Sequence, residues 1–502
     1  MSHGEDMMVA MNPETFANAL DPAHHECKPW TPRLSKSRIQ SGRQCHKRLW
    51  LEIHQPDAVQ WDGAARARLD EGTAFGELAR DLLGGGLLID ADHWHVPEAL
   101  AKTRDALAHP CEDTPRLFEA AFEFDDVRVR VDALERGAES DTLIEVKSST
   151  RAKEEYVWDC AIQTWVLRGA GRPVRKIALA LVNKEFLYTR PGDYDGLLVV
   201  EDITPQVETL LPRIAGIVAQ LKAVAAGPAP ATATGAHCHA PYACPLIAHC
   251  RANEPSPSEH HAELRPRGET LVEQWHAKGH VDRRDVHDAL AWPRFYLGFE
   301  TIRPVIPRWP GTRPFERLPF QFSCHVENEA GELRHEAFID LSGNLPLASL
   351  TDHLIDVLGD DGPILVWNRS SAANCIRALI KRLPDKGEAL LRIADRLLDL
   401  QSIFHENHHH CDTRGSWSTK PVLPTLASDL GYGDLEAGDG SAAQHACLEA
   451  IAPATTAPRR EELRRHRLAC CERSTLALVQ LARWRREALT ADWPDASHAE
   501  SR

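Results

Sequence analysis

Four cysteines enclose the first half of this chain, and their nesting constrains the fold more than any other feature. Cys45 stands alone near the start, whereas Cys238, Cys244 and Cys250 follow late in the same half with five residues between neighbours. Four thiolates suit a [4Fe–4S] cluster with Cys45 as the distant ligand. Such a cluster would fasten the first helix to the end of the domain and remove unfolded-chain entropy, as a long crosslink does.

Two other interpretations of these cysteines stay open. Structural zinc usually takes Cys-X2–4-Cys pairs, which this spacing does not match. The thiols would also be explained as unrelated small core residues. The remaining cysteines are expected to be structural: Cys27, Cys111, Cys160, Cys324, Cys375, Cys411, Cys447, Cys470 and Cys471.

Composition limits the class of protein. A chain of 502 residues with 43% apolar residues allows several domains with cores. No apolar run reaches the roughly 20 residues that span a bilayer, and no signal peptide is apparent. Thirteen cysteines without a secretory signal predict a reducing cytoplasmic location and no membrane partner. The formal net charge of −15 disfavours a coat of nucleic acid but allows a local basic groove.

A group of five cations surrounds Cys45 and leaves two readings open. Nucleic-acid contact is one, and an ordinary solvated helix face is the other. The group is Lys36, Arg38, Arg43, Lys47 and Arg48.

Helices and strands alternate after a tail over residues 1–33. Ser35 is the predicted N-cap of a helix that runs to Trp50. Gly84 ends a second helix that begins near Asp70. Short β-rich segments separated by turn residues predict a meander. The expected strands cover 117–124, 127–134 and 142–148, followed by a helix over 151–168, a hairpin over 177–182 and 185–188, and an amphipathic helix over 207–225.

The sequence divides into two α/β domains. The first covers residues 34–252, and a linker and helix cover 253–290, where a polar segment contains Pro255 and Pro257. A second α/β domain follows over 291–488, and 489–502 form a C-terminal tail.

Paired carboxylates and a lysine form a candidate site in the first domain. Asp132 and Glu145 on neighbouring strands can point into one cleft, and Lys147 shares the face of Glu145 through strand alternation. Carboxylates suit Mg²⁺ or Mn²⁺, and hydrolysis of a phosphodiester needs such an ion and a nearby cation. Glu119 would support the metal through water, and Gln163 would hold the attacking strand or Lys147. As a bare pattern, a charged edge strand explains these residues equally well.

With Glu119 and Gln163, the run Asp132…Glu145-Val146-Lys147 resembles the PD-(D/E)XK core of RecB-type nucleases, including CRISPR-associated RecB-like exonucleases. The resemblance covers about residues 34–252. It implies that Asp132, Glu145 and the Val146 carbonyl hold the metal, that Lys147 is the catalytic cation, and that Cys45 joins the three later cysteines around a cluster. Several relatives carry a metal-binding His where this chain has Gly76, which puts metal affinity or number in doubt.

The second half resembles DnaQ-like (DEDD) exonucleases over about residues 291–488, beginning with Tyr296-Leu-Gly-Phe-Glu-Thr301. Two metal ions need four carboxylates. Carried over by position, these fall at Gly298, Glu300, Ala372 and Ser474, so Glu300 alone survives. The resemblance therefore implies an RNase H-like fold that has lost activity; Asp399 and Glu472 are nearby acids at non-matching positions.

Two further segments of the second half carry predictions of their own. The run His405 to Cys411 is expected to be a solvated loop, because consecutive histidines point in different directions. The stretch from Gly415 to Leu426 would bind a strand or a protein partner. The whole chain resembles a bacterial family of unknown function that fuses the two kinds of domain.

The leading functional hypothesis is a metal-dependent DNA nuclease that acts on single strands or ends in repair or foreign-DNA processing. The alternative is a non-catalytic nucleic-acid-binding or assembly protein derived from a nuclease. RNA as substrate is a third possibility, since nothing in the sequence distinguishes the sugars.

Overall fold

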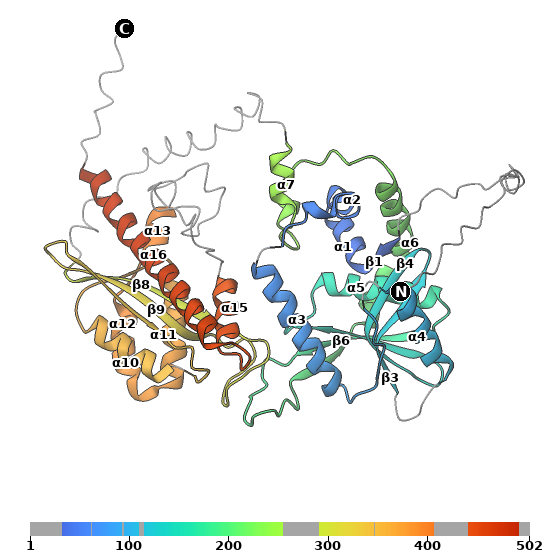
Figure 1. Ribbon diagram of the computed structural model, residues 1–502, viewed down its shortest axis with the longest axis horizontal. Coiled ribbons are helices and arrows are strands. Elements are labelled where there is room, and N and C mark those ends of the chain that lie inside the picture. The colour runs from blue at the N-terminus through green and yellow to red at the C-terminus, as the bar shows by residue number, and fades with distance from the viewer. Residues whose placement is uncertain are drawn as a thin grey trace, which may run out of the picture.

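The structure, a computed structural model, describes residues 33–61, 63–92, 95–109, 115–254, 291–345, 347–405 and 440–490. These residues form a mixed α/β protein with two sheets, seen side by side in Figure 1. The predicted α/β class is confirmed at this level. Nearly all of the expected tails and linker, and the run from residue 406 to 439 with most of the histidine cluster, lie outside the described residues.

The first sheet is built around an antiparallel meander that continues into a parallel pair. Its strand order is β2-β3-β4-β5-β6-β7, with β1 paired to β4. Strands β3, β4 and β5 pair antiparallel, and α5 then carries the chain back to β6, which runs parallel to β5. The strands are β1 (Leu34–Ser35), β2 (Leu87–Leu88), β3 (Arg116–Phe124), β4 (Val127–Glu135), β5 (Asp141–Lys147), β6 (Val174–Val182) and β7 (Leu198–Asp202).

Helices surround this sheet. Helix α5 buries half of its residues, and α6 packs along it with an apolar side that includes Ile214, Val218 and Leu221. Among the described helices, α6 has the length and apolar composition to cross a bilayer, and a packed core helix has the same composition. The helices are α1 (Lys36–Gln44), α2 (His46–His54), α3 (Gly63–Leu82), α4 (Val96–Ala108), α5 (Glu154–Gly169), α6 (Thr204–Ala226) and α7 (Ile247–Ala252).

Three expected elements of the first half differ from those observed. The single helix expected to run to Trp50 is broken at Cys45, whose extended backbone (φ −159°, ψ 122°) separates α1 from α2. Ser35 does cap α1, since its hydroxyl accepts from the Arg38 N–H at 3.2 Å. Helix α3 begins at Gly63, earlier than expected.

The predicted hairpin over residues 177–182 and 185–188 is wrong. Strand β6 pairs with β7, and Tyr188 instead forms an isolated antiparallel bridge with Thr312 of the second half. The prediction failed because Tyr188 pairs with a segment more than 100 residues away, which the local sequence pattern does not indicate.

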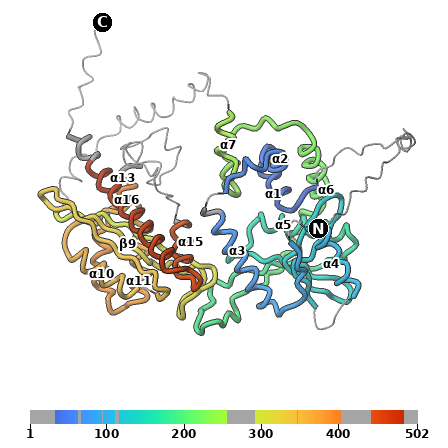
Figure 2. The backbone as a smooth tube through the Cα atoms, in the orientation of Figure 1, coloured from blue at the N-terminus to red at the C-terminus, as the bar shows by residue number. Residues whose placement is uncertain are grey.

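The second sheet has the order β10-β9-β8-β11-β12. Strands β8, β9 and β10 pair antiparallel, whereas β8, β11 and β12 run parallel. Helix α16 lies across β8 and β9, as the tube in Figure 2 shows. The elements are β8 (Arg294–Ile302), β9 (Leu318–Glu327), β10 (Leu333–Ile339), α10 (Leu347–Leu358), β11 (Ile364–Val366), α11 (Arg369–Arg382), α12 (Gly387–Asp395), β12 (Leu397–Asp399), α13 (Leu400–His405), α15 (Gly440–Ala450) and α16 (Ala457–Thr490).

The two halves pack against each other through α3 and the loop that follows β8. Phe75 of α3 and Phe186 share an apolar cluster with Val305. The Glu71 carboxylate accepts the Val305 N–H at 3.0 Å, and α15 contacts α3. Helix α3 therefore has one side against the second half and another over the first sheet.

Candidate functional site

The two predicted acids lie opposite each other on paired strands. Ala133 of β4 is paired with Ile144 of β5, so Asp132 and Glu145 are neighbours on the other face of the sheet. Asp132 Oδ2 accepts the Val146 N–H at 2.7 Å. Glu145 is only 1% exposed, so its charge needs partners.

Three donors supply those partners. Glu145 Oε1 accepts from Lys147 Nζ at 2.7 Å and from Lys36 Nζ at 2.6 Å, and Glu145 Oε2 accepts from Gln163 Nε2 at 2.7 Å. Lys147 Nζ also donates to Asp159 Oδ2 at 2.8 Å. Three carboxylates and two ammonium groups are thus gathered in one network, which leaves one negative charge in excess when all are ionised.

The pKa shifts of these groups show which carboxylate carries the excess negative charge. Burial alone would raise the pKa of Glu145, but the ammonium groups of Lys147 and Lys36 hold it far below its ordinary value. Burial lowers and the neighbouring carboxylates raise the pKa of Lys147, and the carboxylates prevail. Burial and the charge of Glu145 raise the pKa of Asp132 to about 7. Asp132 is therefore the acid whose charge the protein compensates least.

Asp132 faces a cavity of about 400 Å³ between α3 and the end of the sheet. Glu119 lines the same cavity; its backbone adopts φ 58° and it is absent from the pairing of β3 with β4, although the register is the same on both sides of it. Arg68 and Arg80 of α3 line the opposite side, and neither has an ion pair within the described residues. The cavity thus combines acids on the sheet with cations on the helix.

Gly76 also lines this cavity, and a Cβ added there would meet no atom within 4 Å. The position at which the resemblance to RecB-type nucleases would place a histidine therefore has open space in front of it.

Sequence reasoning included one residue whose observed partner is different, and it missed others. Gln163 is fully buried and donates to Glu145, which itself accepts from Lys147, and a contact between Gln163 and a bound strand stays a prediction. Lys36 and Asp159 were not predicted as site residues. Gln40 was missed too; its amide donates to Asp159 Oδ1 at 2.9 Å. Their partners lie far away in the chain, and no local spacing signals them.

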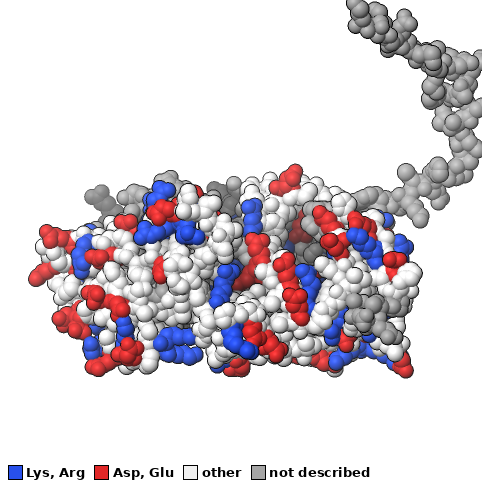
Figure 3. Space-filling model, turned by 60° about the horizontal axis from the view of Figure 1, so that its bottom comes forward, with Lys and Arg blue, Asp and Glu red and all other residues white. Residues whose placement is uncertain are grey.

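Several members of the basic group around Cys45 make specific internal contacts, so the group is more than a solvated helix face, and nucleic-acid contact stays a prediction. Arg43 stacks on the Trp158 ring at 3.6 Å, and Arg48 pairs with Glu52 at 2.7 Å. Lys47 Nζ donates to a backbone carbonyl at 3.3 Å. On the face drawn in Figure 3, cations and acids of the described residues are interspersed.

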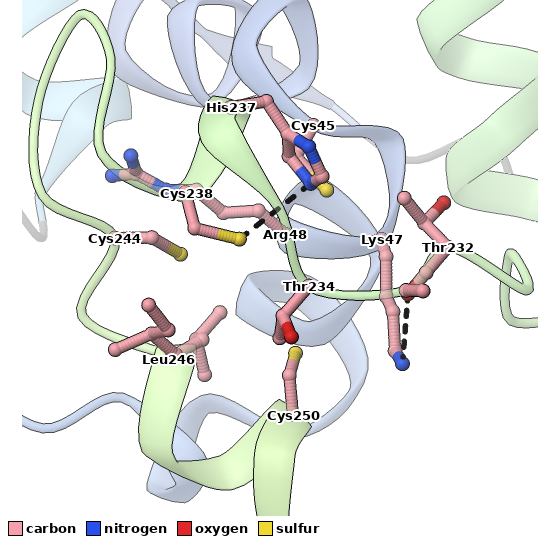
Figure 4. A pocket seen from close by; sticks show the side chains of 12 residues that line it. Cys45, Lys47, Arg48, Thr232, Thr234, His237, Cys238, Cys244, Leu246 and Cys250 are labelled. Atoms are coloured by element: carbon pink, nitrogen blue, oxygen red, sulfur yellow. Dashed lines mark hydrogen bonds between the residues drawn. The ribbon is translucent and has the colours of Figure 1, made fainter. Parts of the chain in front are cut away.

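The four predicted cysteines line one pocket, which Figure 4 shows. Cys45 reaches it from the break between α1 and α2, Cys238 from the short helix Ala236–Cys238, Cys244 from the following loop and Cys250 from α7. All four are free thiols. The cavity between them is about 10 Å³, and Lys47 and Arg48 also line it.

Within the described residues no group of three or more His, Cys, Asp or Glu side chains has metal-binding geometry. Burial raises the pKa of Cys244 and of Cys250, so both are neutral thiols in the metal-free protein. Gln44 fastens the loop to α1, because its amide donates to the carbonyls of His237 and Tyr242 at 2.8 and 2.7 Å.

Comparison with known proteins adds one likeness. Residues 295–418 match a domain of unknown function (DUF2779). The expected likeness to a family of unknown function is confirmed for this part of the chain, and the match names no activity. A search of curated proteins found no match.

The matched segment contains Glu300, which has a cationic side chain as its partner. Glu300 Oε1 accepts from Arg467 Nη2 of α16 at 2.9 Å, and Arg467 is 4% exposed. At the other expected positions, Gly298 lies against Thr475, Ala372 is buried, and Ser474 donates to a backbone carbonyl of its own helix.

The two nearby acids have other contacts. Asp399 accepts backbone N–H groups of Arg369 and Ser402, and Glu472 lies 3.8 Å from His335.

Proposed function

We propose that this protein is a metal-dependent nuclease that hydrolyses phosphodiester bonds of DNA, acting on single strands or ends in repair or in the processing of foreign DNA. In this proposal the first half has a PD-(D/E)XK core of the RecB type, and the second has an inactive DnaQ-like, RNase H-like fold. One observation carries the proposal: Asp132 and Lys147 line one cavity with Arg68 and Arg80, and Glu145 is buried directly behind, bonded to Lys147.

The donors beside the cavity fit a hard divalent cation. Asp132, Glu145 and the Val146 carbonyl are oxygen ligands of the kind that Mg²⁺ and Mn²⁺ prefer. Gln163 Oε1 is a buried acceptor without a donor within the described residues, which water on a bound ion would satisfy. A bound ion would neutralise phosphate charge and lower the pKa of a water molecule.

The protein's own groups would orient and stabilise the phosphate. Lys147, fixed by Glu145 and Asp159, presents a permanent positive charge to an oxyanion at the face of the sheet. Arg68 and Arg80 would contact flanking phosphates from α3. Glu119 would hold water near Asp132.

The four cysteines would hold a [4Fe–4S] cluster. Deprotonated thiolates and a cluster together carry negative charge, and Lys47 and Arg48 at the pocket would offset it. The pocket must widen from its metal-free size, since a cavity of about 10 Å³ has room for no more than about one water. Zinc and unliganded thiols are the alternatives that iron and sulfide measurements would distinguish.

The test is cleavage of a labelled single-stranded oligonucleotide in Mn²⁺ by the wild type and by Lys147→Ala. We expect the rate to fall by at least about 100-fold, the contribution expected of a positioned charge in catalysis. Lys102→Ala, which removes an exposed lysine of α4, is the matched control and should cut normally. Thermal melting of both variants separates loss of chemistry from loss of fold. Cleavage by Lys147→Ala at the wild-type rate would refute the assignment.

A non-catalytic nucleic-acid-binding or assembly protein is the second candidate. Two observations favour it. The oxygens of Glu145 already accept from two lysines and a glutamine, and Gly76 has no side chain that could bind a metal. Binding of DNA in EDTA without cleavage in Mn²⁺ would support it. RNA presented in the same assay tests the third possibility.

A further inference from the structure

An exposed aromatic ring lies beside the carboxylate network and is not used by the proposed chemistry. Tyr242 belongs to the cysteine loop and is 50% exposed, whereas aromatic side chains usually lose most of their surface to the core. An exposed ring held next to a candidate nuclease site is available to contact a ligand.

The position of Tyr242 is fixed by α1. Gln40 and Gln44 are one helical turn apart and therefore lie on the same face of the helix. Gln40 donates to Asp159 Oδ1 at 2.9 Å, and Gln44 donates to the Tyr242 carbonyl at 2.7 Å. Tyr242 is thus held about one helical turn, ~6 Å along α1, from the carboxylate that positions Lys147.

Cations and a second ring continue the surface. Burial and the nearby Tyr156 of α5 raise the pKa of Tyr242 to about 12, so the two rings are close neighbours. The ammonium groups of Lys147 and Lys153 lie 5.2 and 5.4 Å from the centre of the Tyr156 ring. Lys153 is exposed and has no ion pair within the described part of the chain. Aromatic rings beside cations are how proteins bind unpaired nucleotides, and here Lys153 is the cation without an ion pair among the described residues.

We infer that Tyr242 is a stacking residue that selects single-stranded nucleic acid by packing against an unpaired base while the neighbouring lysines contact its phosphates. The inference rests on the proposed function, and it adds the residue that distinguishes a single strand from a duplex. A paired duplex keeps its bases stacked inside the helix, so Tyr242 contributes nothing to duplex binding.

The test measures binding in EDTA, so that it does not depend on cleavage. A fluorescein-labelled single-stranded oligonucleotide and the matching duplex are titrated with full-length wild type, Tyr242→Ala and Tyr242→Phe. Loss of one stacked base predicts a single-strand affinity about 5- to 100-fold weaker for Tyr242→Ala, with duplex affinity unchanged. Tyr242→Phe keeps the ring and retains wild-type affinity. Leu391→Ala, which removes an exposed apolar side chain of α12, is the control.

A fluorescent base analogue in the oligonucleotide reports stacking directly. Quenching on binding by the wild type and its loss in Tyr242→Ala support the inference. Equal single-strand affinity of the two proteins overturns it and leaves the proposed nuclease intact. Equal weakening of single-strand and duplex binding also overturns it, because the ring would then act on the fold of the loop or on another partner. If the wild-type protein binds neither the single strand nor the duplex, both the inference and the proposed function are wrong.

Discussion

Lys36 makes a prediction that the structure quantifies. Its ammonium lies 2.6 Å from Glu145 Oε1, and the two side chains are 23% and 1% exposed. Removing every partner of a buried ion costs about 3–5 kcal/mol. Lys36→Met leaves Glu145 with Lys147 and Gln163, so the expected loss is that of one charge-assisted hydrogen bond, about 1.5–3 kcal/mol in the free energy of unfolding.

A double-mutant cycle isolates this pair. Lys36→Met, Glu145→Gln and the double variant are unfolded in urea with EDTA present, and tryptophan fluorescence and circular dichroism follow the transition. In Glu145→Gln, the Lys36 ammonium loses its carboxylate partner, and Lys36→Met then removes that unpaired charge. The free energy of unfolding of the double variant should therefore exceed the value expected from adding the two single losses by about 1–2 kcal/mol.

The control for this cycle is the exposed pair of Lys102 and Glu98, whose removal should leave the urea midpoint near that of the wild type. A coupling energy for Lys36 and Glu145 within about 0.3 kcal/mol of zero would show that the ammonium is not part of the network.

Two other predictions concern pH and the cysteines. Burial and the neighbouring His335 lower the pKa of His325 to about 4 from its ordinary value of 6.5, so the unfolded chain takes up the proton first. The free energy of unfolding should therefore fall by up to about 3 kcal/mol as pH drops from about 6.5 to 4, and His325→Gln should lose that part of the slope in urea titrations; an unchanged slope contradicts the assignment. Anaerobically purified Cys45→Ala should contain no iron or sulfide, whereas Cys375→Ala, altered at a buried thiol of the second half, should match the wild type; equal iron in both would exclude Cys45 as a ligand.

Much of the first sheet was predictable because its signals are local. Turn residues at Asp125-Asp126 and Arg136-Gly137 separate segments of β-rich composition, and the observed strands β3, β4 and β5 begin and end within a residue or two of the predicted positions. The cap at Ser35 and the end of α3 before Gly84 follow from side-chain and φ preferences of single residues. The shared face of Glu145 and Lys147 follows from strand alternation.

The rest depends on contacts that local pattern does not contain. Lys36 and Glu145 are 109 positions apart, and only the packing of α1 on α5 and the sheet brings them together. The break at Cys45 was missed for a different reason. Cys45 N–H still donates to Ser41 and its carbonyl still accepts from Leu49, so the hydrogen bonds of a helix continue on both sides of one extended residue. Composition and periodicity cannot distinguish that arrangement from an unbroken helix.

Helix α1 explains why the cysteines and the acids are nested in the sequence. Lys36, Gln40 and Gln44 are spaced by four residues and form one stripe, which contacts Glu145, Asp159 and the cysteine loop in turn. The stripe spans about 12 Å at 1.5 Å per residue, so α1 fixes the separation between the candidate metal site and the loop.

The extended conformation of Cys45 directly after this stripe places its thiol at the cysteine pocket, where a cluster would hold it. Because α1 connects the two sites, a shift of the loop on gaining or losing a cluster would be transmitted to Lys36 and Gln40. In the proposed function, the side chains that orient the acids of the sheet would therefore depend on a pocket that contributes no group to the chemistry.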